Sequence, residues 1–210
     1  ISCSLVGSEM CIRDRSKDRV EPKCPVARQC GGCQIQEMRY EAQLAFKQKM
    51  VQNNLERIGG LSDFEMYPVI GMETPYAYRN KAQFPVGEDK DGNIVIGFYA
   101  GRTHHIVEQT DCCIGAPENG EVLRKVKAYM QKNQIRPYNE EHHSGIVRHI
   151  LIRTGYHTKE IMVCLIVNAA KASCLKNAEQ LTESLREMEG MTSVMVNFNT
   201  EKTNVILGKK

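Results

Sequence analysis

Three cysteines lie within ten residues, at Cys24, Cys30 and Cys33. The surrounding stretch, residues 16–36, carries charged side chains, two prolines and a glycine pair, but neither a helical nor a strand period. We therefore expect a loop that takes its order from the cysteines rather than from a hydrophobic core.

The spacing Cys-x5-Cys-x2-Cys leaves three chemistries open for this loop. The two glycines between Cys30 and Cys33 let the backbone curl so that both sulfurs can face one centre. Structural zinc and a cubane iron–sulfur cluster both need a fourth ligand, and Cys112 or Cys113 is the later cysteine in a loop-like context. Zinc sites commonly pair two Cys-x2-Cys knuckles, of which this chain has one, and a thioredoxin-like redox pair needs a strand before Cys30. An iron–sulfur cluster fits the pattern best, and an odd total of nine cysteines disfavours a disulfide framework.

Beyond the loop, apolar periodicity predicts hairpins interrupted by single helices. Helices are expected at 38–58, 117–133 and 173–188, and strands at 67–70, 76–86, 94–99, 145–154, 160–168, 192–198 and 203–207. Ser173 is the expected N-cap of the last helix. The expected fold class is therefore α+β, a Cys-rich iron–sulfur loop joined to a mixed or antiparallel sheet with packed helices.

Bulk composition narrows the function. The longest apolar run, residues 161–167, is far shorter than the roughly 20 residues that a membrane-spanning helix needs. With 28 Lys and Arg against 25 Asp and Glu, the net charge is only +3, so nucleic-acid binding requires a local basic patch. A chain of 210 residues can form one large domain or two small ones.

Four motifs follow one another along the chain. They are Cys24-Pro to Cys30-Gly-Gly-Cys33-Gln34, then Tyr78-Arg-Asn-Lys-Ala-Gln-Phe84, then Asp111-Cys-Cys-Ile-Gly-Ala-Pro117, and finally Gly145-Ile-Val-Arg-His-Ile-Leu-Ile-Arg153. In this order and spacing, residues 16–210 resemble the uracil-5 RNA methyltransferases of transfer and ribosomal RNA, most of all the branch that acts on 23S ribosomal RNA.

The resemblance implies a [4Fe-4S] cluster bound by Cys24, Cys30, Cys33 and Cys112, with Cys113 as the second choice for the fourth ligand. It also implies S-adenosyl-L-methionine as the methyl donor. In that family the covalent chemistry takes place in a C-terminal Rossmann-like methyltransferase domain, which would begin after residue 210. We therefore expect a fragment that is inactive by itself, with no catalytic or cofactor-binding residue of its own.

The sequence of residues 1–15 and the family resemblance of the rest predict how the chain is divided. Residues 1–15 resemble translated adapter sequence and are set aside as non-native. Residues 16–60 are expected to form the iron–sulfur loop and its helix. Residues 61–210 are expected to form a central α+β domain that contacts RNA and supplies the fourth cluster ligand.

Five polar side chains are candidates for RNA contact. In the strand expected at 76–86, Arg79, Lys81 and Gln83 alternate onto one face, and Arg148 and Arg153 flank the apolar centre of a later strand. An ordinary solvated face is the alternative. The resemblance implies that the partner is RNA, ribosomal RNA above all, and that the intact enzyme is a cytoplasmic monomer without a membrane partner. A stand-alone zinc-binding or RNA-binding module without catalytic activity is the other functional alternative.

Overall fold

The computed structural model describes residues 16–209, which form two compact units. The smaller unit comprises residues 16–27 and 33–75, and the larger comprises Arg28–Gly32 and residues 76–209. The expected boundary at residue 60 therefore lies inside the smaller unit, and part of the cysteine loop belongs to the larger one. The stretch expected to be an adapter-like tail, residues 1–15, lies outside the described residues.

The smaller unit contains the helix expected at 38–58 in two parts, none of whose residues is buried. Helix α2 (Tyr40–Asn53) passes directly into a π-helical turn, η1 (Asn54–Ile58), and the chain then turns at Gly60, whose φ is +63°. The strand expected at 67–70 is not formed. That segment is instead tied to α2 by side chains, because Val69 donates its backbone N–H to the side-chain oxygen of Gln48 at 3.2 Å, as Met72 just after it does to the Tyr40 hydroxyl at 2.7 Å.

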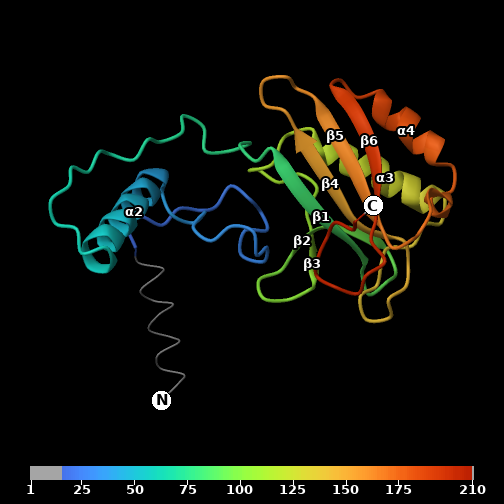
Figure 1. Cartoon of the computed structure of the whole chain (residues 1–210), viewed down its shortest axis with the longest axis horizontal. Coiled ribbons are helices and arrows are strands. Elements are labelled where there is room, and N and C mark those ends of the chain that lie inside the picture. The colour runs from blue at the N-terminus through green and yellow to red at the C-terminus, as the bar shows by residue number, and fades with distance from the viewer. Residues whose placement is uncertain (1–15, 210) are drawn as a thin grey trace, which may run out of the picture. The chain divides into compact units, whose positions relative to one another are not determined.

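The larger unit is built on one six-stranded sheet with the strand order β3-β2-β1-β4-β5-β6 (Figure 1). Its strands are β1 (Lys81–Glu88), β2 (Ile94–Tyr99), β3 (Ile106–Glu108), β4 (Val147–Thr154), β5 (Ile161–Val167) and β6 (Met191–Phe198), and its helices are α3 (Asn119–Lys132), the 3-10 helix η2 (Ala172–Cys174) and α4 (Ala178–Arg186). Neighbouring strands are antiparallel except β5 and β6. That parallel pair requires a crossover, which η2 and α4 provide.

Helices α3 and α4 cover one face of the sheet and bury the main core against it (Figure 1). Alternate residues of a strand share a face, so β1 sends Ala82 and Phe84 into this core, where Phe84 is fully buried. The two helices are linked by Lys125, whose ammonium donates to the backbone carbonyl of Ser184 at 2.8 Å. Within residues 76–209, neither α3 nor α4 lies on the opposite face of the sheet.

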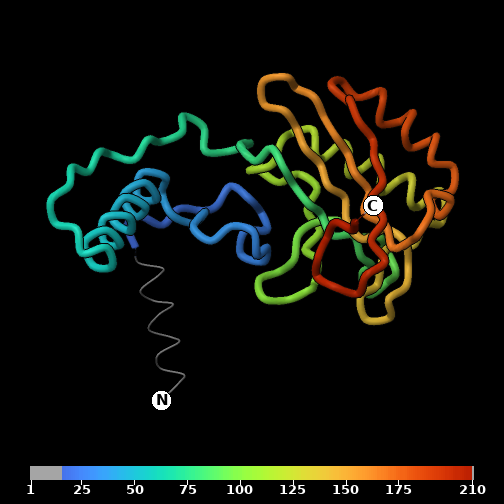
Figure 2. The backbone as a smooth tube through the Cα atoms, viewed as in Figure 1, coloured from blue at the N-terminus to red at the C-terminus, as the bar shows by residue number. Residues whose placement is uncertain are grey.

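The last third of the chain differs from the expected elements in two places. Helix α4 starts later than expected, because Asn177 occupies the left-handed region at φ +52° and serves as the N-cap in place of Ser173. The strand expected at 203–207 is absent. Instead the chain after β6 folds back as a loop, shown in red in Figure 2, because the Asn199 side-chain amide donates to the carbonyls of Val205 and Ile206.

The expected fold class is wrong in its organising element. It joined a Cys-rich iron–sulfur loop to the sheet and its helices, yet no group of three or more His, Cys, Asp or Glu side chains within residues 16–209 is arranged to hold a metal ion. The element that organises the larger unit is the six-stranded sheet with its helical layer. The part of the chain that the structure describes also contains no helix long and apolar enough to cross a membrane.

Candidate nucleic-acid interface

The helix-free face of the sheet carries a row of side chains that crosses four strands. Lys81 of β1 pairs with Arg153 of β4, Arg153 with Met162 of β5, and Met162 with Ser193 of β6. Because the side-chain period of a strand is two, these four residues project from the same face. Two cations therefore stand side by side at one end of the row.

The central part of this face, on β4 and β5, is contacted by the chain's own C-terminal loop. Ile206 packs against a second, smaller apolar cluster that consists of Leu151, Cys164 and Ile166. Burial raises the pKa of the Cys164 thiol, which fits a packing role for this cysteine. The first row lies beyond the loop and stays accessible, so the uncovered part of the face is the part that carries Lys81 and Arg153.

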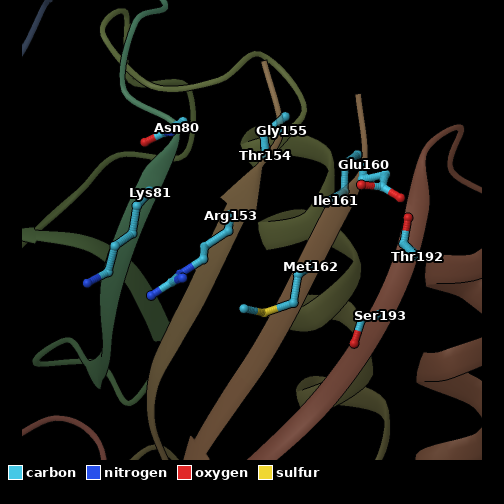
Figure 3. A pocket seen from close by; sticks show the side chains of 10 residues that line it. All are labelled: Asn80, Lys81, Arg153, Thr154, Gly155, Glu160, Ile161, Met162, Thr192 and Ser193. Carbon is cyan, nitrogen blue, oxygen red and sulfur yellow. The ribbon is translucent and has the colours of Figure 1, made fainter. Parts of the chain in front are cut away.

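An open pocket of about 550 Å³ lies over this row (Figure 3). It is lined by Asn80, Lys81, Arg153, Thr154, Gly155, Glu160, Ile161, Met162, Thr192 and Ser193. The Lys81 and Arg153 side chains extend over the sheet in the same direction, and both are exposed (Figure 3). Neither forms a salt bridge with any other residue from 16 to 209.

The electrostatics of this pair favour an anionic ligand. Like charges directly opposite each other on neighbouring strands destabilise a sheet, and Lys81 and Arg153 are such a pair. A bound phosphate removes that repulsion and gains charge-assisted hydrogen bonds from both side chains. The pocket can therefore bind an anion through the positive charges of Lys81 and Arg153, which the sheet holds side by side.

Comparison with known proteins identifies proteins that are similar to this chain. No family model matches it. An uncharacterized RNA methyltransferase of Halalkalibacterium halodurans is 46% identical over 205 residues, which is 97% of this chain and 44% of the relative. One of Clostridium tetani is 42% identical over 206 residues, again 44% of its length. Among solved structures, the Pyrococcus abyssi tRNA (uracil-54, C5)-methyltransferase in complex with S-adenosyl-L-homocysteine matches with a TM-score of 0.67 and 25% identity, over 92% of this chain and 40% of that one.

The chain is similar to RNA methyltransferases over nearly all of its length. It spans less than half the length of the curated relatives it matches. The family resemblance drawn from the four motifs is thereby confirmed, whereas the assignment to the ribosomal RNA branch stays a prediction. The structural match also completes the correction of the fold class, because a methyltransferase structure, rather than a cysteine-centred loop, accounts for 92% of the chain.

Only part of the expected RNA-contact set is brought together by the fold. Lys81 and Arg153 are neighbours, and Gln83 follows in the second row, half-buried. Arg79 lies just before β1, where its backbone N–H donates to the carbonyl of Ile114 at 2.9 Å. Arg148 lies apart from the others and is buried, with an exposed fraction of 3%.

The guanidinium of Arg148 is committed to the protein's own backbone. It donates to the carbonyls of Asn199 at 2.9 Å, Glu201 at 2.7 Å and Thr203 at 3.1 Å, and it lies over the ring of Tyr138 at 4.4 Å. These contacts fasten the loop that covers the lower part of the sheet face. Arg148 therefore positions that loop, and the accessible cations of the face are Lys81 and Arg153.

Sequence reasoning missed the side chains that complete the pocket, among them Glu160, Met162, Thr192 and Ser193. The strands that carry them were expected close to where they lie. The parallel pairing of β5 with β6 sets Ser193 beside Met162. This pairing could not be predicted from the sequence of either segment alone. Alternation within 160–168 and 192–198 could indicate which side chains share a face, but only the partner strands show which of them lie side by side.

The four expected cluster ligands have ordinary protein surroundings in this structure. The thiol of Cys30 accepts the backbone N–H of Gly32 at 3.4 Å, and that of Cys33 accepts the side-chain amide of Gln36 at 3.7 Å. Cys24 is buried, and the carbonyl of Cys112 accepts the N–H of Gly115 at 2.9 Å. No group of three or more possible metal ligands is arranged among residues 16–209, and no step of the proposed function is routed through the cluster.

Proposed function

We propose that this chain is the RNA-holding part of an enzyme that transfers a methyl group from S-adenosyl-L-methionine to C5 of uridine in RNA. The observation that carries the proposal is the accessible Lys81–Arg153 pair on the sheet face of a chain that is similar to RNA methyltransferases. The uracil-C5 specificity is supported by the name of the matching Pyrococcus abyssi enzyme, and the methyl donor by the S-adenosyl-L-homocysteine in its structure.

The finer parts of the proposal come from the four sequence motifs. They point to ribosomal RNA as the substrate and to a cytoplasmic, monomeric enzyme. Within the described residues, the role assigned to the chain is to grip the phosphate backbone, so that a target base can leave its stack and reach a catalytic pocket. Lys81 and Arg153 supply the positive charge for this grip, and the rigid sheet fixes its place.

Removing both cations is expected to weaken RNA binding about tenfold. The double variant Lys81→Met, Arg153→Met loses two phosphate contacts, so the slope of log K against log salt becomes shallower by about 1. The measurement is fluorescence anisotropy with a short single-stranded RNA over a series of salt concentrations.

The matched control removes the same two charges elsewhere. Lys132 of α3 and Arg186 of α4 are exposed and belong to the helical layer on the other face of the sheet. Lys132→Met, Arg186→Met is expected to bind RNA within about twofold of the parent, since it changes only the long-range field. Equal losses in the two double variants would show that the sheet face is not the RNA site.

The [4Fe-4S] cluster is a separate proposal that rests on the sequence resemblance, with Cys24, Cys30, Cys33 and Cys112 as ligands. Anaerobic purification followed by iron and acid-labile sulfide analysis tests it. About four irons and four sulfides per chain are expected, and their loss in Cys30→Ala. Zinc without sulfide would identify the alternative zinc module, and a metal-free parent chain would remove the cluster altogether.

A further inference from the structure

The pocket over the sheet face has two chemically different ends. Lys81 and Arg153 occupy one end, and Glu160, Thr192 and Ser193 occupy the other, with Met162 between them (Figure 3). The first row of the sheet fixes this order, because Met162 pairs with Arg153 on one side and with Ser193 on the other. A ligand that fills the pocket therefore contacts cations at one end, a thioether in the middle, and a carboxylate and hydroxyls at the other end.

Glu160 is held in place at its end of the pocket by the backbone. Its carbonyl accepts the N–H of Gly155 at 2.8 Å, which closes the turn between β4 and β5, and its own N–H donates to the Thr158 hydroxyl at 3.4 Å. The side chain is exposed and forms no salt bridge with the other described residues. Its carboxylate is therefore available to a ligand.

The separation of the two ends matches the reach of a single nucleotide. Glu160 lies two residues before Met162, the direct partner of Arg153, so it is a diagonal neighbour of Arg153 at about 7–8 Å. A phosphate at Lys81 and Arg153 thus leaves its own sugar and base over Met162 and toward Glu160. The polarizable thioether of Met162 can pack against the flat base or the sugar.

The carboxylate determines what kind of group can lie at the far end. A carboxylate only accepts hydrogen bonds, and it repels phosphate. The group that faces Glu160 must therefore be a donor, and the donor nearest to the phosphate in a ribonucleotide is the ribose 2′-hydroxyl. That hydroxyl is the feature by which proteins distinguish RNA from DNA.

We propose that this pocket holds one unpaired ribonucleotide, with its phosphate on Lys81 and Arg153 and its 2′-hydroxyl donating to Glu160, so that Glu160 selects RNA over DNA. The inference rests on the proposed function, because it takes the sheet face to be an RNA site. It goes further in naming a specificity-determining residue and the chemical group that this residue recognises.

The test compares two single-stranded oligonucleotides of the same sequence, one RNA and one DNA, by fluorescence anisotropy with the 210-residue chain. The parent is expected to bind the RNA about fivefold more tightly than the DNA, the net value of one typical hydrogen bond. Glu160→Ala is expected to bind the RNA and the DNA equally, because the variant loses the contact with the 2′-hydroxyl. It also loses the repulsion between the carboxylate and the phosphates, which affects both oligonucleotides. Glu183→Ala removes an exposed carboxylate from α4 and is expected to keep the parent's preference.

The outcomes separate this inference from the proposed function. If Glu160→Ala keeps the parent's ratio of RNA to DNA affinity while Lys81→Met, Arg153→Met weakens both oligonucleotides, the sheet face binds nucleic acid but Glu160 does not select the sugar. A parent chain without any RNA preference overturns the inference in the same way. If the cation double variant binds both as well as the parent does, the proposed function fails and the inference with it.

Discussion

Replacing Arg148 by methionine is expected to lower the free energy of unfolding by about 3 kcal/mol, because three backbone carbonyls lose a charged donor at once. Methionine fills part of the volume, so the loss reports mainly the hydrogen bonds and the stacking over Tyr138. Urea denaturation at neutral pH measures the change.

The Arg148→Met substitution is expected to destabilise some segments of the chain more than others. The residues that Arg148 holds, 199–203, are followed by Ile206, which covers the apolar cluster on the open face. Amide hydrogen exchange should therefore quicken in 199–208 before it quickens in β1 or β4.

A charge-matched control is available in α4. Arg186→Met removes an exposed guanidinium and should change the free energy of unfolding by less than about 0.5 kcal/mol. If Arg148→Met proved no more destabilising than Arg186→Met, the buried arginine would not be what fastens the loop.

Arg148 also shows where sequence reasoning stops. The alternation in β1 correctly separated Lys81 and Gln83 from Ala82 and Phe84, since a period of two is a local property of the strand. Arg148 lies at a register shift between residues 147 and 149, where a bulge interrupts that period. Nothing in the neighbouring residues indicates the bulge, and Arg148 was predicted as an RNA contact because it and Arg153 flank the apolar centre of this strand.

Other differences have the same origin in distant partners. The segment 203–207 has strand-like composition, yet the Asn199 amide takes its carbonyls and prevents a ladder. The pocket residues on β6 acquire their neighbours only through the parallel pairing with β5. The helices and the hairpin around 88–94 were readable because their signals, a 3.6-residue period and a turn sequence, are contained within the segments themselves.

His149 gives the second large effect, a dependence of stability on pH. Its side chain is buried, and within residues 16–209 its Nδ1 atom has no hydrogen-bond partner. Burial, and then the nearby positive charge of Arg148, lower its pKa from 6.5 to about 4, against a small opposing influence of Glu140. The folded protein therefore keeps the imidazole neutral well below the pH at which an unfolded chain protonates it.

The sign of the effect follows from proton binding. Between pH 6.5 and pH 4 the unfolded chain binds a proton at His149 that the folded chain does not, so the free energy of unfolding falls as the pH falls through this range. At about 1.4 kcal/mol for each pKa unit, the protonation of His149 in the unfolded chain lowers the free energy of unfolding by about 3 kcal/mol at pH 4. Above pH 6.5 this loss is absent. Urea denaturation of the parent and of His149→Leu at several pH values between 7 and 4 measures it.

The difference between the two curves is the informative quantity, because carboxylates add a common background in acid. His149→Leu should lose less stability than the parent as the pH falls, and the gap should widen steadily below pH 6.5. His157→Leu, at an exposed position in the turn between β4 and β5, should follow the parent. Parallel curves for the parent and His149→Leu would mean that His149 is protonated in the folded state as readily as in the unfolded one. In that case the interior around Arg148 would be open to water, and the tight loop anchor argued for Arg148 would fail with it.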